Sequence, residues 1–255
     1  MMNQTFNQKP YASGRVRALL TIVLLGACAA CGALSIIVNA VLIGMLRSAG
    51  DQSAVYEFGE SVTELLYVGV ALLQVLVFIA TAIAFLIWVH RAYRNLPALG
   101  VRRLDTTPGW AVGYFFIPFA NLVKPFQVVR EIWHGSTPRG GGGGFDGHDN
   151  FSVAVPSSGT PALIGWWWAF WIIANVAGRA SSRATDMAAT IGGMALASWA
   201  TIASDALFIV AALLAILVVK RIDDMQEAKF RESGMQWPPP PPESFETPRH
   251  ASQTF

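Results

Sequence analysis

Charged residues are scarce in this chain, and that scarcity limits the protein classes it can belong to. Asp, Glu, Lys and Arg make up 13% of the 255 residues, whereas hydrophobic residues make up 53%, and the mean hydropathy is +0.44. An ordinary soluble domain contains about 25% charged residues. The composition therefore argues against a soluble globular domain and predicts that much of the chain lies in a lipid bilayer.

Several functional signals are also missing. The net charge is only +2 and the cations do not form the basic face that nucleic-acid binding requires, so we expect no nucleic-acid partner. The sequence shows no nucleophile and base pair, zinc-ligand spacing or nucleotide fingerprint, so we predict no catalytic residue, metal, cofactor or enzymatic activity. The two cysteines, Cys28 and Cys31, have a spacing that occurs in redox and metal motifs. The alternative is that both are small packing residues, and their apolar flanks favour that alternative.

Long hydrophobic runs dominate what is present. A bilayer span needs about 20 apolar residues, and four runs qualify as predicted spans: 18–46, 62–89, 161–178 and 187–219. The last is longer than needed and should tilt or protrude. A lipoprotein cleavage box ending at Cys28 is the alternative for the first run, but that run continues to Leu46, beyond what a signal segment requires.

Polar and low-complexity segments divide the chain around these runs. Residues 1–17 form a predicted cytoplasmic tail, 135–160 a linker rich in Gly, Ser and Pro, and 223–255 a disordered Pro-rich tail. The membrane regions are 18–134 and 161–222. We predict an all-α integral membrane protein with about four transmembrane helices.

A further apolar segment, about 108–134, is interrupted by Pro118 and Pro125, which disturb a helix. Crossing the bilayer as one helix would bury Lys124 at a cost of roughly 2.5–3.5 kcal/mol. We therefore predict a Pro-broken helical segment that is interfacial or re-entrant. Its second half has an apolar helical face made of Leu122, Phe126, Val129 and Trp133. That face either lies at headgroup level or packs on the protein's own cytoplasmic rim.

The distribution of Lys and Arg predicts the orientation. With four spans and both termini in the cytoplasm, only Arg47, Arg179 and Arg183 fall outside. The inner side then carries a candidate face for anionic lipid or a protein partner, made of Arg91, Arg94, Arg102, Arg103, Lys124 and Arg130 with Trp110 and Trp133. The alternative is that these cations only fix the orientation.

Three polar residues within the spans are candidate intramembrane contacts: Asn39, Gln74 and Asp205. Rows at i, i+4 spacing suggest that the first and fourth spans pack together, with Asn39 hydrogen-bonding Asp205. The rows are Ala27, Cys31, Ser35 and Asn39, and Ala189, Gly193, Ala197, Thr201 and Asp205. Asp205 either holds helices in register or forms a proton or cation site, and a single carboxylate favours the structural role.

Several segments are specific enough to identify a family: His90–Gly100, Thr107–Gly113, Ile117–Trp133 and Val218–Ile222 followed by Gln226 and Glu227. These segments resemble a bacterial membrane family, domain of unknown function 4328. The likeness covers roughly 60–228 and extends more weakly through the first span. It implies a multi-helix protein of the bacterial cytoplasmic (inner) membrane, and it brings no activity or catalytic residues to transfer.

Two functions fit these observations. The first is a membrane scaffold or regulatory component whose basic cytoplasmic face contacts anionic lipid headgroups or a membrane or cytoplasmic protein. The alternative is a small transporter or channel subunit in which Asp205, Asn39 and Gln74 line a path and a re-entrant turn at 121–125 acts as a gate. A homo-oligomer is compatible with either function.

Overall fold

The computed structural model describes residues 10–48, 64–138, 162–188 and 190–233, and these residues form helices and turns without any strand. Four long helices make up the body: α1 (Arg15–Ser48), α3 (Glu64–Asn95), α6 (Ala162–Asp186) and α7 (Ile191–Glu232). Short elements connect α3 to α6: η2 (Pro97–Leu99), α4 (Pro108–Gly113), η3 (Ala120–Leu122) and α5 (Lys124–Ser136). The predicted all-α class is confirmed.

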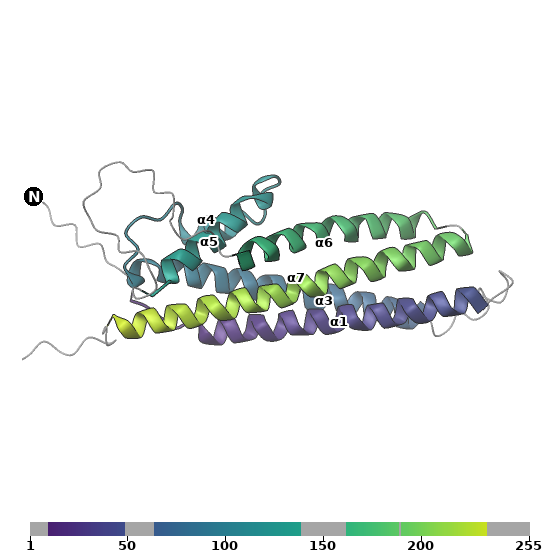
Figure 1. The fold of residues 1–255 in the computed structure, drawn as a ribbon, viewed down its shortest axis with the longest axis horizontal. Coiled ribbons are helices and arrows are strands. Elements are labelled where there is room, and N and C mark those ends of the chain that lie inside the picture. The colour runs from purple at the N-terminus through teal and green to yellow at the C-terminus, as the bar shows by residue number, and fades with distance from the viewer. Residues whose placement is uncertain (1–9, 49–63, 139–161, 189, 234–255) are drawn as a thin grey trace, which may run out of the picture.

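The four long helices alternate in direction along an elongated bundle (Figure 1). Helix α7 packs against α1 on one side and α6 on the other, and α3 packs against α1. The start of α1, the end of α3 and the end of α7 lie at the same end of the bundle as α4 and α5. We call this end the hairpin end, because α4 and α5 form a helical hairpin there.

Three of the long helices are long and apolar enough to cross a membrane: α1, α3 and α7. The predicted third span is helical, as α6, but it does not reach the same hydropathy. Its tryptophans, together with Arg179 and Arg183, lower the average. The described residues therefore contain three candidate spans, and α6 runs beside them as a fourth long helix.

Helical structure extends into segments that we predicted to be tails or linker. Helix α1 starts at Arg15, inside the predicted tail 1–17, α5 continues to Ser136, and α7 continues to Glu232, so a disordered tail from 223 is wrong at its start. Contacts between the two ends explain the difference, because the Tyr11 ring stacks on Phe230 at 4.2 Å between centroids. The five-glycine run and the proline run lie outside the described residues.

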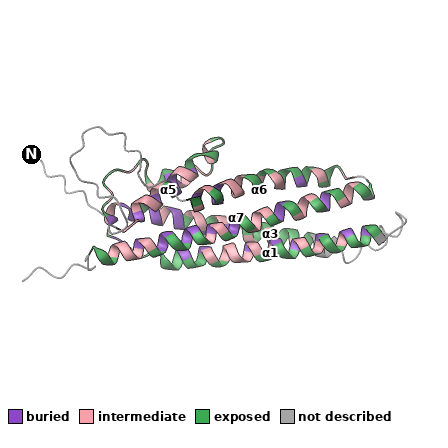
Figure 2. Ribbon diagram, viewed as in Figure 1, coloured by how far each residue is buried: buried purple, intermediate pink, exposed green. Residues whose placement is uncertain are grey.

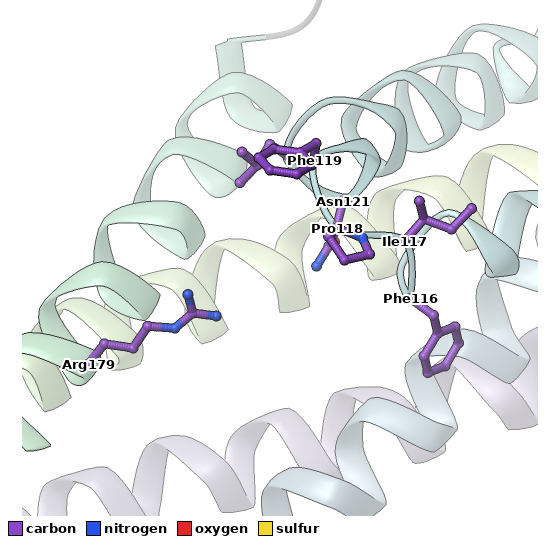
Figure 3. A pocket seen from close by; sticks show the side chains of 7 residues that line it. Phe116, Ile117, Pro118, Phe119, Asn121 and Arg179 are labelled. Atoms are coloured by element: carbon purple, nitrogen blue, oxygen red, sulfur yellow. The ribbon is translucent and has the colours of Figure 1, made fainter.

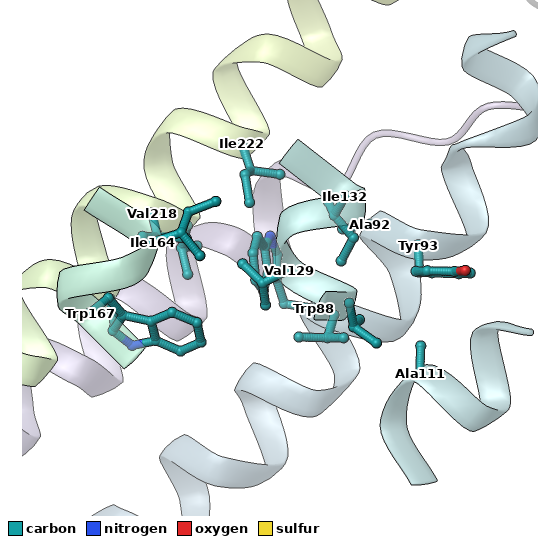
Figure 4. Packing of buried hydrophobic residues seen from close by; sticks show 14 of the residues in the cluster. Trp88, Ala92, Tyr93, Ala111, Val129, Ile132, Ile164, Trp167, Val218 and Ile222 are labelled. Carbon is teal, nitrogen blue, oxygen red and sulfur yellow. The ribbon is translucent and has the colours of Figure 1, made fainter. Parts of the chain in front are cut away.

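The hydrophobic core is concentrated at the hairpin end (Figure 4). Side chains from four helices meet there and are almost fully buried: Trp88 and Val89 of α3, Val129 and Ile132 of α5, Ile164 of α6, and Val218, Val219 and Ile222 of α7. The rest of the bundle shows fewer buried positions (Figure 2). Helix α3 there exposes an apolar ridge made of Leu72, Leu76, Ile79, Ile83 and Ile87.

A buried glutamine links three elements beside this core. Gln226 of α7 donates from Nε2 to the Ala92 carbonyl and to Ser136 Oγ, both at 3.0 Å, and its Oε1 accepts from Asn95 Nδ2 at 3.3 Å. Buried polar groups are costly unless they are hydrogen-bonded. This network therefore fixes the positions of α3, α5 and α7 relative to one another.

We expect Gln226→Leu to lower the stability of the detergent-solubilised chain. Losing these hydrogen bonds, and leaving the Asn95 amide without its glutamine partner, should cost about 2–4 kcal/mol. For a chain of this size that corresponds to a fall in melting temperature of roughly 5–10 °C. Thermal unfolding followed by circular dichroism measures it. Arg221→Leu, at an exposed position of the same helix, is the control, and equal effects of the two changes would contradict the role of the network.

Candidate functional site

The hairpin between α4 and α5 is built by proline and by a strained turn. The Thr107 side chain caps α4 by accepting from the Trp110 amide at 3.4 Å, and Pro108 begins the helix. Between the two helices Phe119 has a φ of 64°, which is rare for a bulky residue. Pro125 is the second residue of α5. The apolar segment thus forms two short helices separated by a turn.

One face of α5 is buried within the protein. Val128, Val129 and Ile132 are buried in the core. Glu131 accepts hydrogen bonds from Tyr93 Oη at 2.8 Å and from the Asp105 amide at 2.9 Å. The structure thus shows packing on the protein itself for Phe126, Val129 and Trp133 of the predicted face, whereas Leu122 is exposed in the turn before α5.

The turn of the hairpin, residues 114–123, is attached to α6 but remains largely open. Trp168 Nε1 donates to the Leu122 carbonyl at 3.0 Å, and the Trp168 ring stacks on Trp171 at 4.7 Å. Trp167 and Trp168 are buried. The turn nevertheless exposes large apolar side chains: Phe116, Ile117, Phe119, Leu122 and Val123.

The predicted basic face is only partly free. Arg91 is half-buried and donates from Nε to the Ala12 carbonyl at 3.1 Å, close to Arg17 and Arg94. Trp133 packs against the core, whereas Trp110 is 56% exposed. The remaining cations of the face are exposed: Arg94, Arg102, Arg103, Lys124 and Arg130. Lys124 and Arg130 lie over aromatic rings, Tyr114 at 5.6 Å and Phe126 at 5.8 Å.

Sequence reasoning missed an acidic group at the same end. Glu227 accepts hydrogen bonds from Tyr11 Oη at 3.1 Å and from Ser13 Oγ, and Asp223 lies nearby. Burial, followed by the charge of Glu227, raises the pKa of Tyr11, so Tyr11 stays protonated and remains a donor. The spacing of Asp223, Glu227 and Phe230 on one helical face was the available signal.

His134 does not add a positive charge to this end at neutral pH. Burial, reinforced by the charge of Arg130, lowers the pKa of His134 below its ordinary value. Its Nε2 atom is buried without a hydrogen-bond partner among the described residues. The exposed positive charges at the hairpin end are therefore those of arginine and lysine, and Asp105 and Asp224 are exposed acidic residues at the same end.

A second polar group lies midway along the bundle, between α1, α3 and α7. Asp205 Oδ1 accepts from Gln74 Nε2 at 3.1 Å, and the Ser35 side chain lies beside the same carboxylate. Asp205 Oδ2 is buried without a partner among the described residues. The predicted hydrogen bond from Asn39 is wrong, because Asn39 Nδ2 donates to the Ser35 carbonyl at 2.9 Å instead. Gln74 and Asp205 do meet.

The predicted α7 row is divided between two neighbours. Thr201 Oγ1 pairs with Ser181 Oγ of α6 at 2.8 Å, whereas Asp205 faces α1 and α3. Positions four apart advance by about 40° around a helix of 3.6 residues per turn, so such a row leaves one face within a few steps. The buried stripe of α1 combines steps of three and four residues: Cys28, Gly32, Ser35, Asn39, Ile43 and Leu46. Ala189 lies outside the described residues.

Residues 51–224 match the sequence family described as domain of unknown function DUF4328. The chain belongs to this family. The resemblance of the hairpin segments to DUF4328 is thereby confirmed, whereas α1 lies outside the matched residues. No curated protein and no solved structure matches the chain.

Within the DUF4328 match lie the hairpin, the exposed cations from Arg94 to Arg130, and the Gln74–Asp205 pair. Ser35 and Asn39, on α1, lie before it. The family match therefore covers both candidate sites, although part of the Asp205 environment comes from outside it. The family description assigns no function to any of these residues.

We expect the Gln74–Asp205 hydrogen bond to show as a coupling between two substitutions. Asp205→Leu leaves the Gln74 amide buried without its partner and should cost about 1–3 kcal/mol, and Gln74→Leu should cost a similar amount. The double variant should be less destabilised than the sum, because two apolar side chains replace both partners. Thermal unfolding of the four proteins in one detergent measures this, and strictly additive effects would rule out the coupling.

Proposed function

We propose that this DUF4328 protein is a scaffold or regulatory component of the bacterial inner membrane that binds anionic lipid at its hairpin end. In this proposal α1, α3, α6 and α7 cross the bilayer and both termini lie in the cytoplasm. It is not an enzyme. The apolar lengths of α1, α3 and α7 support membrane insertion, and α6 runs alongside them.

The observation that carries the proposal is the pairing of exposed cations with an exposed tryptophan at the hairpin end. Arg94, Arg102 and Arg103 are exposed, and Trp110 follows on the adjacent short helix. Tryptophan favours the headgroup region, and each nearby Lys or Arg adds about 1 kcal/mol of attraction to an anionic leaflet. Cations that only set the orientation would not need the hairpin that presents Trp110.

A lipid-preference measurement with the full chain tests this proposal. We expect Arg94→Gln/Arg102→Gln/Arg103→Gln to lose the preference for phosphatidylglycerol over phosphatidylcholine by about tenfold or more, since three charges are removed. Native mass spectrometry of the detergent-purified protein with each lipid gives the ratio. The preference of the wild-type protein should also weaken with added salt.

The matched control changes cations at the opposite end, Arg47→Gln/Arg183→Gln. It should keep the wild-type lipid preference. If the control and the triple variant lose the preference equally, or if the wild-type protein binds both lipids alike, lipid binding at the hairpin end is refuted. A reporter after Phe255 checks that both variants keep the cytoplasmic orientation.

A transporter or channel subunit is the second candidate, and one observation favours it. Asp205 Oδ2 is buried and has no hydrogen-bond partner in the described part of the chain, so this oxygen is available to a proton or a cation. Gln74 and Ser35 would then hold the carboxylate in place. The segment 121–125, where the hairpin turn joins α5, would act as the gate of this path.

Flux through reconstituted vesicles tests the second candidate. We expect a proton or cation flux to be abolished by Asp205→Asn, which can still accept a hydrogen bond from Gln74 but cannot ionise. Thr201→Val, on the α6 side of the same helix, is the control and should keep the flux. The absence of flux in the wild-type protein under proton, sodium and potassium gradients would exclude transport of these ions.

A further inference from the structure

A pocket of about 380 Å³ lies between the hairpin turn and α6 (Figure 3). Its walls are mostly apolar and come from residues 116–119 and Leu122 of the turn. Two polar residues complete it, Asn121 of the turn and Arg179 of α6. None of the residues proposed above to bind lipid headgroups lines this pocket.

Both polar residues have unused hydrogen-bonding capacity. Within the described part of the chain, Arg179 has no hydrogen bond or ion pair, and the Asn121 side chain makes no hydrogen bond. The Asn121 oxygen is buried, which leaves its amide nitrogen as the group that the pocket can use. Figure 3 shows the Arg179 guanidinium extending from α6 toward the turn that carries Asn121.

Local geometry explains why these groups converge. Side chains of a helix lean toward its N-terminus, so Arg179 leans along α6 toward the hairpin end. The turn is held against α6 by the hydrogen bond from Trp168 to the Leu122 carbonyl. The strained backbone of Phe119 presents a ring that is 86% exposed beside the pocket. Strain of this kind persists only where the surrounding structure imposes it.

The position of Arg179 makes an anion the matching ligand. If α6 crosses the bilayer as proposed above, Arg179 lies about 25 Å along the axis from Ala162, at about 1.5 Å per residue. That position is near the outer boundary of a hydrocarbon layer about 30 Å thick, and the Arg179 side chain leans back from there into the layer. A cation there is costly without a counter-charge, and no acidic side chain lines the pocket.

We propose that this pocket binds an amphiphilic anion, a carboxylate or phosphate group joined to an acyl chain. The guanidinium of Arg179 donates hydrogen bonds to two oxygens of the head group, and the Asn121 amide donates a further hydrogen bond. The acyl chain lies against Phe116, Ile117 and Phe119. This site goes beyond the proposed binding of headgroups at the hairpin end and uses different residues.

The test measures binding of oleate and of dioleoyl phosphatidic acid to the delipidated full chain by native mass spectrometry. We expect Arg179→Gln to weaken the binding of at least one of them about 10- to 100-fold, which corresponds to the loss of a charge-assisted hydrogen bond. Arg183→Gln, one turn further along α6 and outside the pocket, should bind within about twofold of wild type. Both substituted positions are exposed, so both variants should fold.

The outcomes separate the possible ligands. Binding of oleate alone identifies a free carboxylic acid, and binding of phosphatidic acid alone identifies a phospholipid head. Equal binding of uncharged methyl oleate, or wild-type affinity of Arg179→Gln, overturns the proposed site. If Arg94→Gln/Arg102→Gln/Arg103→Gln loses binding while Arg179→Gln keeps it, the anions bind at the hairpin end, which supports the proposed function and refutes this pocket.

Discussion

Burial of one face of α5 against the ends of α3, α6 and α7 is the contact on which the remainder of the structure depends. Apolar burial in water contributes roughly 25 cal/mol per Å², and this cluster contains the largest fully buried side chains of the described residues. Further along the bundle, α3 exposes its apolar ridge instead of burying it. A helix with so much exposed apolar surface is stable only in an apolar surrounding, which is why a bilayer is the consistent environment.

This arrangement separates two kinds of helix association. At the hairpin end, large aromatic and aliphatic side chains interlock around Trp88 and Ile132. Midway along the bundle, small and polar side chains let the helices approach closely, as at Gly32, where an added methyl group would lie 3.2 Å from Ile209. Small interfacial residues and buried hydrogen bonds are the usual means of holding helices together where no water drives association. The two kinds of association thus occupy different lengths of the same helices.

The sequence sufficed for features that depend on one segment at a time. Long hydrophobic runs predicted the four long helices, and Pro118 and Pro125 predicted a broken segment rather than a span. It failed for features that depend on which helix surfaces pack against each other. Asn39 donates a hydrogen bond to a carbonyl of its own helix, so it does not reach Asp205. The residues after 223 are helical because α1, α5 and the first described residues pack on them. Of the residues predicted to form the basic face, Arg91 and Trp133 have structural contacts that spacing along the chain does not reveal.

The stacking of Tyr11 on Phe230 has a consequence for the chain as a whole. It brings the first and last described segments together, so the described chain begins and ends at the same place in the bundle. A label at one of these two described segments would therefore lie beside a label at the other. A short linker could join residue 10 to residue 233, and the chain could then be reopened within one of its connections as a circular permutant with the same helix neighbours.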